Sequence, residues 1–163
     1  MIAESDRADA AEMNSFLKRH ALDQTKKGIS RTFVVCAPDG GEPQRVIAYY
    51  SSSVGHLQPQ QLPKVVSDRM TIPVVYLLRL AVDNRFQGSR IGSRLFVHFL
   101  HQLVSVADTT GVYALVLEPL NERVRSFYDR FGLRPLPGSD THMYLRICDV
   151  RQWLAQHSNL KQA

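Results

Sequence analysis

The sequence feature that most constrains the fold is a change of apolar pattern between residues 73 and 119. The segment "PVVYLLRLAVD" (73–83) is a continuous apolar run, which is typical of a buried strand. After Gly88 the apolar residues follow the spacing of one helix face, namely Ile91, Leu95, Phe99, Leu103 and Val106. A second apolar strand, "GVYALVLEP" (111–119), comes next. This strand–helix–strand order predicts a right-handed crossover between two parallel strands.

The segments outside this unit complete an α/β pattern. We expect, in chain order, a helix at 8–20, a hairpin of strands at 31–37 and 44–54 around the turn "PDGGEP", an irregular excursion at 56–69, a helix at 121–132 closed by Gly132, a strand at 141–150 and a terminal helix at 151–157. The hairpin and the last strand imply antiparallel neighbours. A chain of 163 residues fits one domain, so we expect a single α/β domain over 1–163, with a mixed, mostly antiparallel sheet flanked by helices.

The turn from Gln87 to Ser93 lies between the long apolar strand and the helix. The first N–H groups of a helix have no partner inside it and carry partial positive charge, so they favour phosphate. Glycine lets the backbone approach a bulky anion, and Arg85, Arg90 and Arg94 add cationic side chains. The turn therefore indicates a site for a phosphorylated carrier. It is neither a P-loop nor a dinucleotide-binding glycine motif, and taken alone it also fits an ordinary strand–helix turn.

The overall charge favours an anionic partner. Lys and Arg total 20 against 15 Asp and Glu, which gives a formal charge of +5. A basic excess of this size suits nucleic acid, a phosphorylated cofactor or a membrane surface, and it does not choose among them. Cys36 and Cys148 lie far apart in apolar, strand-like runs, so we expect two buried free thiols, no zinc site and a reducing compartment.

The ends of the sequence and its apolar runs indicate a cytoplasmic protein without a membrane segment. The start "MIAESDRADAAEMNSF" contains acids throughout and has no apolar core typical of a signal peptide. The longest apolar stretch, "IPVVYLL", is too short to span a bilayer.

Two motifs resemble those of the GNAT N-acetyltransferases. The segment "RLAVDNRFQGSRIGSRL" is similar to the acyl-CoA-binding motif of that family, Gln/Arg-x-x-Gly-x-Gly/Ala, which falls here on Gln87, Arg90 and Gly92. Arg90 stands where the family usually has glycine. A non-glycine residue is compatible with a helical φ there, and we expect its larger side chain to affect the diphosphate contact and the strength of cofactor binding. The segment "NERVRSFYDRFGL" resembles the later helix of the family, with an Asn followed by a Phe-Tyr pair. The two motifs and the strand order together cover most of the chain.

The resemblance implies acetyl-CoA as cosubstrate, bound by a core at about residues 73–132, and no metal. The strand backbone after Arg79 would bind the pantetheine arm as an extra strand, and the amides of the turn would bind the diphosphate. Asn121 would reach the pantetheine or the thioester. The implied cofactor-binding residues are Leu80, Ala81, Val82, Arg85, Gln87, Gly88, Ser89, Arg90, Ile91, Gly92, Ser93, Asn121 and Phe127.

The resemblance also implies how acetyl transfer is catalysed. Tyr128 would be the general acid that protonates the departing sulfur, although it could also only pack against the cofactor. The backbone N–H of Val82 would stabilise developing negative charge on the carbonyl oxygen. The base is either Glu118, at the end of its strand, or water. We expect His98 and His101 to be residues of a helix surface, with no catalytic role.

A narrower resemblance points to the acetyltransferase toxins of bacterial toxin–antitoxin pairs. It is carried by "RTFVVC", "RVIAYYSSS", "LPKVVSDRMTIPVVYLLRLAVD" and "FYDRFGL". It implies acetylation of the α-amino group of aminoacyl-tRNA, which blocks translation. It also implies a homodimer, neutralisation by a ribbon–helix–helix antitoxin, and contact with DNA only through the toxin–antitoxin complex.

The residue chemistry agrees with an RNA substrate without choosing it. Positive charge attracts phosphates without reading sequence, and the candidate RNA-binding residues are Arg79, Lys26, Lys27 and Arg94. An α-amino group titrates near pH 7.7–8.0, so no strong base is needed. Two alternatives stay open: a GNAT enzyme acting on a protein N-terminus, a lysine or a small molecule, and a non-catalytic nucleic-acid-binding module, which Arg90 would favour. The sequence does not say which aminoacyl-tRNA is modified.

Overall fold

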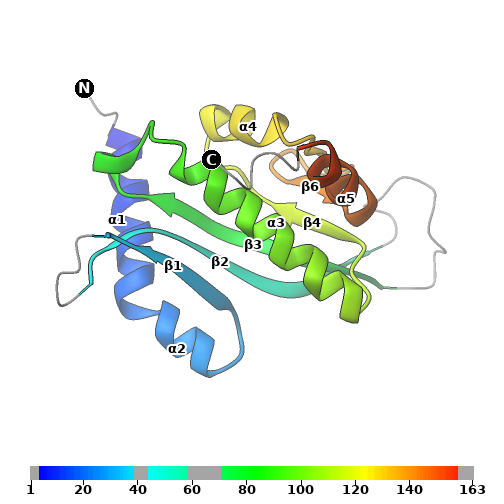
Figure 1. Cartoon of the computed structure of the whole chain (residues 1–163), viewed down its shortest axis with the longest axis horizontal. Coiled ribbons are helices and arrows are strands. Elements are labelled where there is room, and N and C mark those ends of the chain that lie inside the picture. Colours follow the sequence, from blue (N-terminus) through cyan, green and yellow to red (C-terminus); the bar gives the residue numbers. More distant parts are fainter. Residues whose placement is uncertain (1–3, 39–43, 59–70, 158–163) are drawn as a thin grey trace. The chain divides into compact units, whose positions relative to one another are not determined.

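The structure, a computed structural model, describes residues 4–38, 44–58 and 71–157 (Figure 1). Its six strands are hydrogen-bonded in the order β1-β2-β3-β4-β6-β5. In the chain, α1 and α2 precede the strands, η2, α3 and α4 lie between them, and α5 follows the last one. The chain forms two compact units, one of residues 1–53 and 78–95 and the other of residues 54–77 and 96–163. Strands β2 and β3 and helix α3 contribute to both units. This architecture confirms the expected α/β fold with a mixed sheet.

The first unit contains the N-terminal helices and the β1–β2 hairpin. Its elements are α1 (Glu4–Arg19), α2 (Ala21–Lys26), β1 (Arg31–Cys36), the first part of β2 (Val46–Leu57), the end of β3 (Ile72–Val82), η2 (Asn84–Phe86) and the start of α3 (Ile91–Thr109). Strands β1 and β2 pair antiparallel, with Phe33 opposite Tyr50. The core here is Phe16, Ala21 and Tyr49, and the Tyr49 hydroxyl donates a 2.9 Å hydrogen bond to the Met13 carbonyl.

The second unit contains the parallel crossover and the C-terminal elements. They are β4 (Ala114–Leu117), α4 (Glu122–Asp129), β5 (Arg134–Pro135), β6 (Met143–Arg146) and α5 (Ile147–Gln156). Strand β4 pairs parallel to residues Val74–Leu77 of β3 and antiparallel to β6. The parallel pair confirms the crossover predicted from the apolar pattern. Leu103 and the neighbouring Phe99 of α3 are buried as expected, whereas Val106 at the end of the expected helix face is 40% exposed.

The strand expected at 141–150 is wrong at its end. Strand β6 stops at Arg146, and α5 begins at Ile147. The alternation of buried and half-buried side chains in β6 continues through Ile147, which hides the boundary, but Ile147 and Val150 are spaced as on a helix face and both are buried. The short elements α2, β5 and η2 were not expected. The excursion predicted at 56–69 begins inside β2, and its residues 59–69 lie outside the described part, as do residues 39–43 of the predicted turn.

The two cysteines are free thiols, but their expected burial is wrong. Cys36 is only half-buried, and Cys148 is exposed because it lies on α5 rather than on a strand. Within residues 4–38, 44–58 and 71–157, no group of three or more His, Cys, Asp or Glu side chains is arranged to hold a metal ion. In the same ranges, the structure contains no helix with the length and apolar character needed to cross a bilayer.

Candidate functional site

The turn after β3 is organised by an aspartate and an arginine. The Asp83 carboxylate accepts the backbone N–H of Arg85 at 3.0 Å and pairs with the Arg85 guanidinium at 2.6 Å. The hydrogen bonds from Arg85 lower the pKa of Asp83 to about 2. This turn places η2 directly after the strand. The predicted phosphate-binding side chain of Arg85 is thus already paired with a carboxylate inside the turn.

The turn then passes through two residues in the left-handed region, which is where glycine is favoured. Gly88 has a φ of 82° and Arg90 a φ of 63°. Arg90 is the only non-glycine residue with positive φ in the described ranges. The expectation of a helical φ at Arg90 is therefore wrong. For a residue with a side chain, this left-handed conformation costs on the order of 1–2 kcal/mol. Glycine, the usual residue of the family at this position, would adopt it without that cost.

The amides at the start of α3 are the groups that the sequence predicts to bind a diphosphate. The first bond of the helix is donated by the N–H of Arg94 to the carbonyl of Arg90, at 3.0 Å. The N–H groups of Ile91, Gly92 and Ser93 precede this bond and have no partner within the helix. A Cβ built on Gly92 would lie 3.6 Å from Cγ2 of Val82, so the helix starts close against the strand. Together these N–H groups suit an anionic diphosphate.

The end of β3 extends beyond its parallel partner. Pairing with β4 is recorded for Val74–Leu77, and β3 continues for the stretch 78–82, in which Leu80, Ala81 and Val82 are half-buried. The Gln87 side-chain amide donates to the Val82 carbonyl at 3.3 Å and to the Asn84 side-chain oxygen at 2.8 Å. This strand end has the backbone groups that an extended pantetheine arm would use.

Tyr128 lies in the second unit, within an aromatic cluster. It is 5% exposed, and its ring centroid lies 5.1 Å from that of Phe96 and 5.0 Å from that of Phe127. Burial raises the pKa of the Tyr128 phenol, so the group keeps its proton across the physiological range. Its hydroxyl forms no hydrogen bond with the other described residues. The phenol therefore carries its proton at neutral pH, and its raised pKa makes it a weaker acid than an exposed tyrosine.

Asn121 is the N-cap of the helix that carries Tyr128. Its side-chain oxygen accepts the Val124 N–H at 3.0 Å, which satisfies one of the unpaired donors at the start of α4. The side-chain NH₂ group remains as the part of Asn121 with which it could reach a cofactor. Phe127 is half-buried, and the Arg130 guanidinium lies 5.3 Å from its ring centroid.

Glu118 has a neighbour that sequence reasoning missed. A Glu118 carboxylate oxygen lies 4.0 Å from Nε2 of His142. The other ring nitrogen of His142 lies 3.0 Å from the hydroxyls of Ser139 and Thr141. Arg125 of α4 ties this loop down, because it donates to the carbonyls of residues 140 and 141 at 3.3 and 3.4 Å. The pair is far apart in the sequence, and no spacing rule would have found it.

The four predicted RNA-binding residues differ in their solvent exposure and in their recorded ion pairs. Lys27 pairs with Asp23 at 3.0 Å, and Arg79 lies 3.3 Å from Glu12 and 4.1 Å from the ring centroid of Phe16. Nε of Arg79 is buried without a hydrogen-bond partner, and Arg79 lines a pocket with Glu12, Ser15, Phe16, His20 and Gln24. Lys26 and Arg94 are exposed. Helix residues His98 and His101 are exposed and half-buried, respectively.

The predicted site residues form two groups. Residues 79–94 belong to the first unit, with Lys26 and Lys27, whereas Glu118, Asn121, Phe127 and Tyr128 belong to the second. All the residues of each group therefore belong to one unit. The first offers backbone N–H groups to an anion, and the second offers a buried phenol beside aromatic rings.

Comparisons with known proteins identify the family of this chain. The model of the acetyltransferase (GNAT) family matches residues 4–133. A relative described as a tRNA-acetylating toxin, from Mycobacterium tuberculosis strain ATCC 25618 / H37Rv, is 33% identical over 141 residues, or 85% of this chain and 82% of the relative.

Solved structures of AtaT are also similar. AtaT complexed with acetyl-methionyl-tRNAfMet has a TM-score of 0.79 and 26% identity, over 87% of this chain and 85% of that one. A tyrosine-to-phenylalanine mutant of the AtaT toxin, bound to the C-terminus of the antitoxin AtaR and acetyl-CoA, has a TM-score of 0.75 and 25% identity, over 90% and 86% of the two chains.

Proposed function

Since the chain belongs to the acetyltransferase (GNAT) family, we propose that it is a toxin that acetylates the α-amino group of aminoacyl-tRNA and so blocks translation. Family membership makes it an acetyl-CoA-dependent N-acetyltransferase. The observation that carries the finer proposal is the 33% identity to a tRNA-acetylating toxin over 85% of this chain and 82% of the relative. The complex of AtaT with acetyl-methionyl-tRNAfMet supports the same acceptor class.

We propose that acetyl-CoA binds at the turn and at the end of β3. The N–H groups of Ile91, Gly92 and Ser93 would bind the diphosphate, and Leu80, Ala81 and Val82 would bind the pantetheine by backbone hydrogen bonds. Gln87, Gly88, Ser89 and Arg90 would shape the turn around the diphosphate. When bound, acetyl-CoA supplies an acetyl group that its thioester activates for attack by an amine.

The proposed roles of the remaining residues follow from their chemistry. The Val82 N–H would donate to the carbonyl oxygen of the acetyl group, and Tyr128 would hold the proton for the departing thiolate. Asn121 would donate from its side-chain NH₂ group, and Phe127 would bound the cofactor with its ring. An α-amino group titrates near pH 7.7–8.0, and the adjacent ester should lower this pKa further, so the amine would be largely neutral at cell pH and water or Glu118 would suffice to receive its proton. His142 would then lie beside the carboxylate that takes this proton.

The proposed location and partners rest on the resemblance of the sequence to the acetyltransferase toxins. We place the enzyme in the cytoplasm as a homodimer, neutralised by a ribbon–helix–helix antitoxin and touching DNA only in the complex with it. A bound antitoxin is described for AtaT. Among the candidate RNA-binding residues, Lys26 and Arg94 are exposed, while Lys27 and Arg79 have carboxylate neighbours.

An acceptor panel tests the proposal. The purified enzyme would be given acetyl-CoA with a charged tRNA mixture, the same tRNA after deacylation, spermidine, or a lysine-containing peptide, and the released CoA thiol would be measured. We expect release above background with charged tRNA alone. Release with spermidine or the peptide, and none with charged tRNA, would assign the enzyme to another amine. No release with any acceptor, together with no binding of acetyl-CoA by calorimetry, would favour a non-catalytic module.

A further inference from the structure

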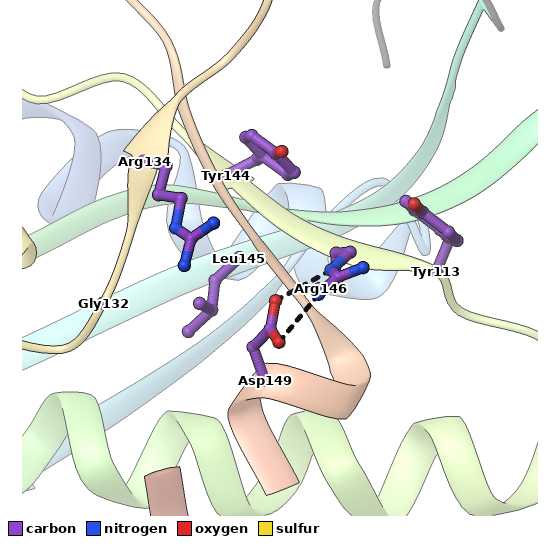
Figure 2. A pocket seen from close by; sticks show the side chains of 7 residues that line it. All are labelled: Tyr113, Gly132, Arg134, Tyr144, Leu145, Arg146 and Asp149. Carbon is purple, nitrogen blue, oxygen red and sulfur yellow. Dashed lines mark hydrogen bonds and ion pairs between the residues drawn. The ribbon is translucent and has the colours of Figure 1, made fainter. Parts of the chain in front are cut away.

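A pocket of about 230 Å³ lies among β4, β5, β6 and the start of α5, in the second unit. It is lined by Tyr113, Gly132, Arg134, Tyr144, Leu145, Arg146 and Asp149 (Figure 2). Tyr113 precedes β4, and Glu118 follows it. At about 3.3 Å per residue, these ends of β4 are roughly 16 Å apart. The pocket extends along β4, from Arg146, which lies opposite Ala114, to Tyr144, which lies opposite Val116.

The charges in the pocket leave one guanidinium in excess. Arg146 donates to both carboxylate oxygens of Asp149, at 2.8 and 3.0 Å, and Figure 2 shows this pair as dashed lines. These hydrogen bonds lower the pKa of Asp149, and the positive charge of Arg134 acts in the same direction. Two guanidinium groups therefore face one carboxylate. The pocket favours an anionic ligand.

Donors remain available for that anion. Arg146 uses Nε and one of its Nη atoms for Asp149, so hydrogens on the other Nη stay unused in this pair. Arg134 is exposed and has no ion pair or hydrogen bond from its side chain to any of the described residues. Asp149 holds Arg146 in one orientation, which lowers the entropy cost of binding a ligand there.

Aromatic surface accompanies these donors. Arg134 and Tyr144 are direct cross-strand partners, so their side chains leave the sheet on the same face with Cβ atoms about 5 Å apart. Tyr144 is half-buried, as is Tyr113 on the other side of Arg146. A simple phosphate needs no aromatic ring. A ring beside a guanidinium is the combination that binds an unstacked base together with its phosphate in single-stranded nucleic acid.

We infer that this pocket binds one unpaired nucleotide of the tRNA substrate, with its phosphate at Arg134 and Arg146 and its base stacked on Tyr144. The inference rests on the proposed function, because it takes the RNA to be the substrate. It assigns RNA contacts to residues that the charge pattern of the sequence did not single out. It also assigns RNA binding to side chains other than those proposed for acetyl transfer.

The test is binding of uncharged tRNA, measured by fluorescence anisotropy over a series of salt concentrations. Arg134→Ala should weaken binding about tenfold and reduce the slope of log K against log salt by about one. Tyr144→Leu should weaken binding at least about fivefold and leave that slope unchanged, because a stacking contact releases no counterions. Arg151→Ala is the matched control, since Arg151 is an exposed arginine of α5 paired with Asp108 outside the pocket, and it should bind as the wild type does.

Other outcomes overturn the inference. Wild-type affinity and slope in both pocket variants would contradict it, and so would equal weakening in Arg134→Ala and Arg151→Ala. If the pocket variants lose dimer mass in light scattering while tRNA affinity is unchanged, a protein occupies the pocket instead. Acetyl transfer to an aminoacyl-adenosine should be unaffected by Arg134→Ala. If the wild type acetylates charged tRNA and both pocket variants bind tRNA normally, the inference about the pocket is wrong and the proposed function stands. If the wild type neither binds nor acetylates tRNA, both the inference and the proposed function are wrong.

Discussion

The turn at residues 83–93 and the aromatic cluster around Tyr128 serve the proposed reaction in different ways. The turn works through its backbone: its useful groups are amides at the start of α3, and its side chains mostly hold one another in place, as Asp83 holds Arg85. The cluster works through one side chain, a phenol packed between Phe96 and Phe127. A backbone site tolerates side-chain changes that keep its conformation. A side-chain site tolerates packing changes better than it tolerates loss of its one polar atom.

The largest effect is expected from removing the hydroxyl oxygen of Tyr128. Tyr128→Phe should reduce acetyl transfer by at least about 100-fold, since a positioned general acid contributes on the order of 10²–10⁴. The ring stays in the cluster, and its hydroxyl forms no hydrogen bond with described residues, so the free energy of unfolding should change by less than about 0.5 kcal/mol. Steady-state kinetics, calorimetry with acetyl-CoA and urea unfolding would be measured together. Full activity in this variant would remove Tyr128 from the mechanism.

The second prediction concerns the close approach of α3 to β3. A Cβ at Gly92 would make an ordinary contact with Val82, at 3.6 Å, whereas the further methyl groups of valine would have to displace the strand or the helix. Gly92→Val should therefore weaken acetyl-CoA binding about tenfold or more by distorting the amides, since overpacking costs about 1–3 kcal/mol. Gly92→Ala is the matched control and should bind acetyl-CoA within about twofold of the wild type. Equal affinity in all three proteins, by calorimetry, would show that the diphosphate is bound elsewhere.

The third prediction separates backbone from charge at Arg90. Arg90→Gly removes the left-handed strain, and after the entropy cost of glycine the free energy of unfolding should rise by about 0.5–1 kcal/mol. Arg90→Ala keeps the strain and removes the charge, so its stability should match the wild type. If the guanidinium contacts the diphosphate, both variants lose acetyl-CoA affinity equally. A less stable Arg90→Gly in urea unfolding would contradict the assignment of strain.

The smallest effect is expected at Asp83. Its folded-state pKa, about 2, lies below the ordinary value of 3.8, so the stabilisation is present above pH 3.8 and is lost as the pH falls toward 2. Because the pair with Arg85 lies at the surface, the contribution should be below about 1 kcal/mol. Asp83→Asn should remove this part of the acid dependence of unfolding, as followed by circular dichroism. An unchanged acid profile would show that the pair does not stabilise the turn.

The sequence predicted most of the fold because its strongest patterns are local. The apolar run of β3, the helix stripe of α3 and the apolar β4 each carry a periodicity that the structure confirms. The end of β6 was misplaced because the alternation of β6 runs through Ile147, the first residue of α5. Strand β5 has two residues, which is too short for any pattern to show.

The site was predicted less completely, since parts of it depend on tertiary contacts. The unpaired amides of the turn follow from the strand–helix junction. The N-cap role of Asn121 was not predicted, because the helix was expected to begin at residue 121 itself. The left-handed Arg90 could not be foreseen, because the sequence alone gives an arginine a helical φ. Glu118 and His142 are distant in the sequence, and the burial of Nε of Arg79 depends on tertiary packing. Only the folded structure reveals these two features.

One measurement tests the proposed reaction most directly. Charged tRNA incubated with the enzyme and radiolabelled acetyl-CoA would be digested with nuclease, and the terminal aminoacyl-adenosine would be analysed by mass spectrometry. We predict one acetyl group on the α-amino nitrogen of the amino acid, absent with deacylated tRNA and reduced at least about 100-fold with Tyr128→Phe. An unmodified aminoacyl-adenosine, obtained under conditions in which the enzyme binds acetyl-CoA and acetylates a different amine, would contradict the account.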